Sequence, residues 1–175
     1  MANFKSYQYN QFDQYYHSGQ FTWTKPSDID ESKPILVHVW GAGGNGHDGA
    51  DSSNRCAGGG GGGLAVKLID VANLGATETI TVGAHSNPGI ENGVGGTSSF
   101  GSHCSATGGN DGNNNAANEG SGPTYGVGGI GLQGDVNRRG GTGGAGYYSS
   151  STNAGGGGGG SAPAPYGVSD GFNGG

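Results

Sequence analysis

The sequence is poor in charge, in cysteine and in long apolar runs, and each shortage excludes a class of protein. Seven lysines and arginines against thirteen aspartates and glutamates give a net charge of −6, which is not the basic footprint of a nucleic-acid-binding protein. No apolar run approaches the length of a membrane span, so we expect no membrane insertion. The N-terminus has no apolar signal-peptide region, which favours free thiols at Cys56 and Cys104 over a disulfide.

Large apolar side chains are also scarce in the second half of the chain. Burying one of them contributes roughly 1.5–3 kcal/mol, whereas ordering a single residue costs roughly 1–2 kcal/mol of backbone entropy. Side-chain burial alone therefore cannot order this half. From Ser105 to Gly175 the large aliphatic and phenylalanine side chains are Val127, Ile130, Leu132, Val136, Val168 and Phe172.

Glycine takes the place of those side chains. Only six of the 44 glycines precede Gly58, and runs of six glycines occur at 58–63 and 155–160. Such a region is either disordered or held together by its backbone, and the charged fraction of 11% argues against disorder. Extended chains with three residues per turn have no internal hydrogen bonds, so their N–H and C=O groups can bond to neighbouring segments. We therefore expect a polyglycine-II helix sandwich over residues 108–175, with variable loops.

The region from 21 to 107 has the pattern of short strands, so we expect a β-rich head that carries the first glycine motifs. The predicted fold is mainly β with little or no α-helix, a small antiparallel β-sandwich head packed on the polyglycine-II sandwich. The segment 34–40 is apolar on both faces and is expected to be the central strand. The predicted strands are 20–24, 34–40, 64–69 and 78–82, with short candidates at 97–100 and 103–107.

The motifs that suggest chemistry are weak. Residues 41–46 match G-x-G-x-x-G, but the following residues have no helical pattern, as a dinucleotide site requires. The five histidines show no paired metal-ligand spacing, and His38 is interpreted as a core or sheet-face residue. Residues 108–112 are similar to a single glycine–aspartate calcium repeat, without a second copy. We therefore expect no cofactor, no metal and no enzymatic activity.

Two further features point to binding. Residues 1–20 are rich in aromatic side chains, and this segment either packs on the head or is an attachment arm that docks on another chain. The inserts between glycine blocks are rich in Tyr, Ser, Asn and Arg, as binding loops are. Solvated turns are the alternative for any single residue. The candidate receptor-binding residues are Asp51, Arg55, Asn114, Tyr125, Arg138, Arg139, Tyr147 and Tyr148.

Several of these motifs together resemble the glycine-rich domain of bacteriophage tail fibres, over residues 21–175. The motifs, in chain order, are Val39–Gly44, Gly60–Ala65, Ile80–Gly83, Gly95–Gly101, Ala106–Gly109 and the ending Gly160–Gly167. The functional type most similar to this pattern is the tip adhesin of T-even-like phages. In those adhesins glycine-rich motifs form a polyglycine-II sandwich, and variable segments between the motifs contact the host receptor.

The resemblance implies a receptor-binding adhesin of the virion tail fibre, assembled in the host cytoplasm. Its expected partners are a host outer-surface receptor, either an outer-membrane protein or a glycan, and another virion fibre protein bound through the N-terminal segment. The alternative is a structural fibre or decoration protein that binds no receptor. An ice-binding polyglycine-II protein is disfavoured because every insert breaks the triplet register.

Overall fold

The fold was analysed in a computed structural model, which describes residues 12–46, 57–85, 93–112, 125–145, 147–149, 152–155 and 160. Its described residues form strands and one short 3-10 helix, η1 (Val71–Asn73), without any α-helix, which confirms the mainly-β prediction. No helix among them is long and apolar enough to span a membrane. The strands are β1 (Gly19–Thr24), β2 (Pro34–Trp40), β3 (Leu64–Asp70), β4 (Thr77–Val82), β5 (Ser98–Phe100), β6 (Cys104–Ala106), β7 (Gly131–Leu132), β8 (Val136–Arg138), β9 (Tyr147–Ser149) and β10 (Thr152–Gly155).

The first eight strands form two antiparallel sheets. One has five strands in the order β1-β4-β5-β6-β7, and the other has three in the order β2-β3-β8. β9 and β10 form a separate antiparallel pair. All six strands expected from the sequence between residues 20 and 107 are present, and each end differs by at most one residue.

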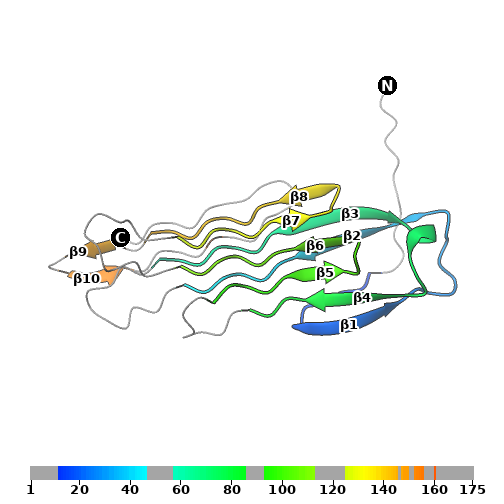
Figure 1. The fold of residues 1–175 in the computed structure, drawn as a ribbon, viewed down its shortest axis with the longest axis horizontal. Coiled ribbons are helices and arrows are strands. Elements are labelled where there is room, and N and C mark those ends of the chain that lie inside the picture. Colours follow the sequence, from blue (N-terminus) through cyan, green and yellow to red (C-terminus); the bar gives the residue numbers. More distant parts are fainter. Residues whose placement is uncertain are drawn as a thin grey trace, which may run out of the picture.

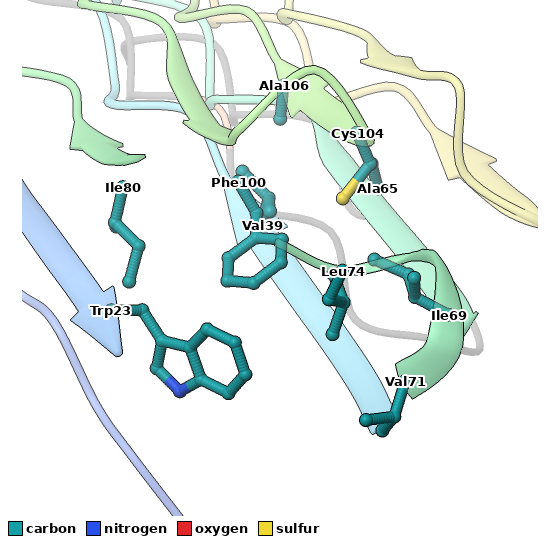
Figure 2. Packing of buried hydrophobic residues seen from close by; sticks show 10 residues of the cluster. All are labelled: Trp23, Val39, Ala65, Ile69, Val71, Leu74, Ile80, Phe100, Cys104 and Ala106. Atoms are coloured by element: carbon teal, nitrogen blue, oxygen red, sulfur yellow. The ribbon is translucent and has the colours of Figure 1, made fainter. Parts of the chain in front are cut away.

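The hydrophobic core lies between these two sheets (Figure 2). Trp23 and Phe100 of the five-stranded sheet meet edge to face, with ring centroids 5.8 Å apart. Alternation along β3 turns Ala65 and Ile69 toward them. The core is small because each strand contributes only one or two large side chains, and η1 closes its outer end with the fully buried Val71.

The expectation that β2 is the central strand was wrong. β2 lies at the edge of the three-stranded sheet, and β3 is its middle strand. Only the inward face of β2, with Val39 buried, packs on the core. The alternate residues Leu36 and Trp40 are each 44% exposed. An apolar pattern on both faces therefore does not reflect burial on both faces here.

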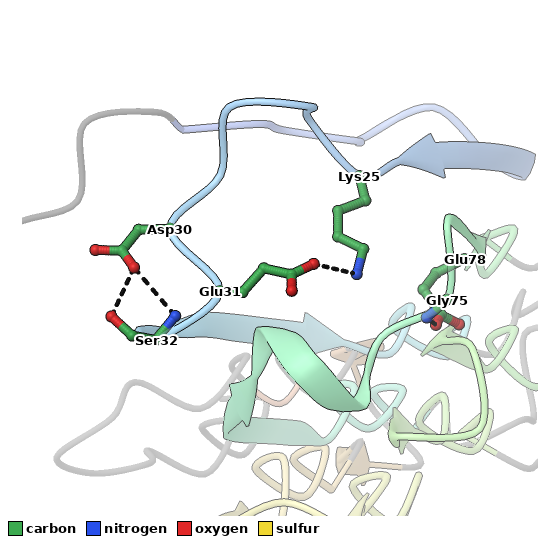
Figure 3. Close-up of polar contacts among 6 residues, drawn as sticks. All are labelled: Lys25, Asp30, Glu31, Ser32, Gly75 and Glu78. Atoms are coloured by element: carbon green, nitrogen blue, oxygen red, sulfur yellow. Dashed lines mark hydrogen bonds and ion pairs between the residues drawn. The ribbon is translucent and has the colours of Figure 1, made fainter.

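The connections at the outer end of the head are held by local polar contacts (Figure 3). Lys25 forms an ion pair with Glu31 at 3.2 Å. The Asp30 carboxylate accepts hydrogen bonds from the hydroxyl and the backbone N–H of Ser32. These bonds, with the nearby Lys33 ammonium, hold the pKa of Asp30 below its usual value. They shape the loop between β1 and β2, which is exposed to solvent and adds little stability.

The side chain of Glu78 on β4 contacts two turns, the one that precedes β4 and the one between β5 and β6. Its Oε1 accepts a hydrogen bond of 2.9 Å from the Gly75 N–H and lies 3.3 Å from His103 Nε2. The Gly75 hydrogen bond is the main cause that lowers the pKa of Glu78, with a further contribution from His103 against the opposing effect of burial. The ionised carboxylate is therefore the form that stabilises the fold.

Cys104 is a free, buried thiol in β6. Burial raises the pKa of this thiol, which keeps it protonated and unreactive at neutral pH. Its expected companion Cys56 lies outside the described residues. Cys104 thus acts as a small apolar core residue.

Glycine-rich extended segments continue from the strands and run side by side away from the two sheets (Figure 1). We name each segment by the strand that it adjoins. Segments that leave the head alternate with segments that return to it, so chain neighbours are antiparallel. They are the β2 segment (41–46), β3 segment (57–63), β4 segment (83–85), β5 segment (93–97), β6 segment (107–112), β7 segment (125–130) and β8 segment (140–145).

Hydrogen bonds between these segments recur every three residues. Gly58 and Gly61 of the β3 segment donate to the β8 segment, whereas Gly60 and Gly63 donate to the β6 segment. The β7 segment in turn donates to the β3 segment from N–H groups three residues apart, at Gly126 and Gly129. A spacing of three means that successive N–H groups point in different directions around each segment. Each segment can therefore bond to several neighbours at once.

The β3 segment is the centre of this arrangement. All of its residues are buried, and it exchanges backbone hydrogen bonds with the β2, β6, β7 and β8 segments and with Gly160. Glycine segments from both sides of residue 107 thus belong to one bundle. The first run of six glycines forms its axis.

Several glycines lie so close to a neighbouring backbone that no side chain would fit. A Cβ added to Gly62 would lie 1.8 Å from the Gly41 carbonyl oxygen, and one on Gly143 would lie 1.8 Å from the Gly58 oxygen. In both cases the obstacle is backbone, which cannot rotate away as a side chain does. Glycine is therefore required at these positions for packing.

We predict that Gly62→Ala destabilises the protein strongly. The added methyl group would overlap the Gly41 carbonyl, and overpacking of this kind costs about 1–3 kcal/mol or more. Chemical denaturation of the full chain measures the loss. The matched control is Gly43→Ala, because a Cβ there meets only the Gly60 oxygen at 3.8 Å. The control should stay within about 1 kcal/mol of the unmodified chain, and equal losses in the two variants would contradict close backbone packing.

We also predict a loss of stability in acid that depends on Glu78. Because the folded-state pKa of Glu78 is lowered below its ordinary value of 4.5, its contribution is complete above that pH and is lost as the pH falls through the folded-state pKa. Glu78→Gln should therefore lower the free energy of unfolding at pH 7 and flatten its decline below pH 4.5. Denaturation at a series of pH values tests this.

The control for that experiment is Glu31→Gln. Its side chain is 66% exposed in a surface ion pair, so its removal should change the free energy of unfolding by less than about 1 kcal/mol at pH 7. An undiminished acid slope in Glu78→Gln would show that another group is responsible.

Candidate functional site

The end of the glycine bundle away from the head, here called the far end, brings together residues that are distant in the sequence. Asn45 donates to the Gly93 carbonyl and accepts from the Gly112 N–H. On the other side of the bundle, Gly58 accepts from Gly126 and donates to Gly144. The ends of six segments therefore lie in one hydrogen-bonded layer.

Four inserts are connected to this layer. Inserts 47–56 and 113–124 have both of their ends in the layer, whereas 86–92 and 146–159 each have one, near Gly93 and Gly144. β9 and β10 belong to the last of these inserts and lie at that end in Figure 1. The inserts span 47–56, 86–92, 113–124 and 146–159.

The candidate receptor-binding residues fall into three groups. Tyr125, at the start of the β7 segment, lies at the far end and is 45% exposed. Tyr147 and Tyr148 belong to β9 at the same end, where the structure describes their backbone. The remaining far-end candidates, Asp51, Arg55 and Asn114, lie outside the described residues but within inserts that are fixed to this layer.

Arg138 and Arg139 are not brought together with the others. Residues 132–139 also lie between two glycine segments in the sequence, but they form the β7–β8 connection of the head. The Asp135 carboxylate accepts a hydrogen bond of 2.8 Å from the Leu68 N–H, and Lys67 Nζ donates to the Gln133 carbonyl at 2.8 Å. Both contacts fix the insert to β3.

The aromatic N-terminal segment meets the head at the opposite end from the inserts. Trp23 Nε1 donates to the Asp13 carboxylate at 3.3 Å, and Trp23 lies near the end of β1 that points away from the glycine segments. Tyr15 packs against Phe21 with ring centroids 5.4 Å apart, whereas Phe12 and Tyr16 are 81% and 76% exposed. Residues 1–11, which precede this contact, lie outside the described residues.

Sequence reasoning missed one insert and one surface. The insert 86–92 lies outside the described residues and joins the β4 segment to the β5 segment, and its Asn87-Pro88-Gly89 turn signal could have identified it. The surface is the outer face of the three-stranded sheet, on which apolar side chains remain exposed. We call it the outer face, and its residues are Leu36, His38, Trp40, Leu64, Val66, Leu68, Val136 and Arg138.

The glycine motif at 41–46 is used for packing. Its N–H groups at Gly41, Ala42, Gly44 and Asn45 donate to carbonyls of the β3 and β5 segments, so they are not available to a phosphate. Within the described ranges, no three His, Cys, Asp or Glu side chains come together in a way that could hold a metal ion. The inserts connected to the far end are therefore the candidate site.

Comparisons of this chain with protein-family models, with curated proteins and with solved structures find no match.

Proposed function

We propose that this protein is a receptor-binding adhesin of a bacteriophage tail fibre, which recognises a host outer-surface receptor through the inserts at its far end. The receptor is an outer-membrane protein or a glycan. The protein acts on the virion after assembly in the host cytoplasm and does so without enzymatic chemistry.

The observation that carries this proposal is the separation of the two ends. Four polar inserts, the last of which contains Tyr147 and Tyr148, are connected to one layer at the far end. Exposed Phe12 and Tyr16 lie with the N-terminal segment on the head. An elongated protein with a clustered set of loops at one end and exposed aromatic side chains at the other suits a fibre component that presents its loops to a cell. The N-terminal segment would bind another virion fibre protein.

We further propose that the glycine bundle is a polyglycine-II sandwich and that the two sheets of the head form a small antiparallel β-sandwich. In favour of the first is the spacing of three between N–H groups that bond to the same neighbour, which matches a helix of three residues per turn. In favour of the second is the core shared by both sheets. A rigid support of this kind holds the inserts in place before binding and lowers the entropy cost of recognition.

Within the proposed site, Tyr125, Tyr147 and Tyr148 would stack on sugar rings or pack on protein, while Asp51, Arg55 and Asn114 would add polar contacts. The location of Arg138 and Arg139 on the head makes them comparison residues for this assignment. The alternative function is a structural virion protein without a receptor. It predicts no binding by any insert.

The test uses the purified full chain, displayed in many copies on beads so that weak contacts add up, as a competitor of phage adsorption to host cells. The unmodified chain should block adsorption. Tyr147→Ser combined with Tyr148→Ser should raise the concentration needed for half-blocking by at least about tenfold, because aromatic anchors carry much of an interface's binding energy. Arg138→Ser serves as the matched control and should leave that concentration within about twofold.

Circular dichroism and thermal unfolding establish that each variant is folded. Failure of the unmodified chain to block adsorption would favour the structural alternative. A loss of blocking in Arg138→Ser but not in the tyrosine variant would place the receptor site on the head.

A further inference from the structure

The outer face of the three-stranded sheet is apolar but unevenly covered. Leu64, where the sheet meets the glycine bundle, is fully buried although it does not belong to the core between the sheets. Farther along the same face, Leu68 is 40% exposed and Leu36 is 44% exposed. Val136 of β8, which pairs with Val66 of β3, is 39% exposed. An apolar patch of this kind on one face of a sheet marks a docking surface.

The position of Gly160 shows which segment of the chain approaches this face. In the three-stranded sheet, β3 lies between β2 and β8, and in the bundle the β3 segment likewise lies between the β2 and β8 segments. The β6 and β7 segments continue from the five-stranded sheet and bond to the β3 segment from the side of the core. The Gly160 N–H donates to the Gly59 carbonyl at 2.7 Å. It does so on a side of the β3 segment that none of these four neighbours occupies. It therefore lies on the side of the β3 segment that continues into the outer face.

The direction of the chain at Gly160 is toward the head. Gly155 pairs with Tyr147 at the far end, whereas a Cβ on Gly160 would lie 2.0 Å from the Gly141 oxygen. Between residues 155 and 160 the chain has thus moved back along the β8 segment toward β8. A chain that kept this direction beyond Gly160 would pass over Leu64 and then Leu68.

We propose that residues 161–175 dock on the outer face and close it. The sequence continues for fifteen residues beyond Gly160, and at about 3.1 Å per residue this is more than enough to reach the end of β3. If the segment kept the register of Gly160 beside Gly60 and ran alongside β3, Tyr166 would lie near Val66 and Val168 near Leu68. These two apolar side chains would cover the exposed surface between β3 and Val136. This inference concerns the head and does not depend on the proposed receptor binding.

A cross-linking experiment on the full chain tests the proposed location. Leu68→Cys and Val168→Cys are combined in a Cys56→Ser background, and a bismaleimide with a reach of about 10 Å, the distance between packed layers, is added. The native Cys104 is buried and protected. Mass spectrometry should find the intramolecular cross-link at least tenfold more often than in the control pair Thr79→Cys with Val168→Cys, because Thr79 is exposed on the opposite, five-stranded sheet.

A second measurement separates docking from chance proximity. Tyr166→Ser combined with Val168→Ser should shift tryptophan emission to longer wavelength, because Trp40 lies on this face and Trp23 is in the core. It should also increase the binding of an apolar dye at least threefold. Val94→Ser, which alters a valine that is 53% exposed in the β5 segment, is the matched control and should change neither signal.

Equal cross-linking of the two cysteine pairs would overturn the proposal, as would unchanged fluorescence and dye binding in the double serine variant. Cross-links between chains, with a dimer in sedimentation that Leu68→Lys dissociates, would assign the outer face to a second copy and would also overturn it.

Discussion

Close approach of one peptide backbone to another is the interaction on which this structure depends. In the β3 segment, residues 57–63, every residue is buried although the only side chain present is the methyl group of Ala57. Hydrogen bonds to four other segments and to Gly160 satisfy N–H and C=O groups that would otherwise be buried without partners. In an ordinary domain, apolar side chains supply most of the stability. Here the absence of side chains is what lets the segments meet.

This constraint explains the division of the molecule into two ends. Glycine segments cannot be joined within the bundle without a turn, so their connections lie at its two ends, in the far-end inserts and in the strands and loops of the head. Strands with Trp23 and Phe100 in the core hold the same segments in register at the head. Because each glycine segment continues from a strand, an error in strand register would shift the hydrogen bonds of the bundle as well. The head and the bundle thus specify one another.

The sequence predicted much of this fold because its signals were local. Alternation and glycine boundaries located β1 to β6, and the run at Gly58–Gly63 indicated backbone packing. What it could not show was which segments become neighbours. Trp40 belongs to an apolar strand but lies on an open face, and this depends on β2 being at a sheet edge. Arg138 follows a polar insert like those of the far end, yet pairing of Val136 with Val66 of β3 places that insert on the head. For the candidate site, the fold brings Tyr125, Tyr147 and Tyr148 to one end. The insert 86–92 was not predicted, although its Asn87-Pro88-Gly89 turn signal is local.

Amide hydrogen exchange is the most direct measurement of the central claim. If backbone hydrogen bonds hold the bundle together, the amides of Gly58, Gly60, Gly61 and Gly63 should be among the slowest to exchange, and their protection should approach the global free energy of unfolding. Exchange of these amides at the rate of an unstructured glycine peptide, while the amides of β3 and β4 remain protected, would contradict the account.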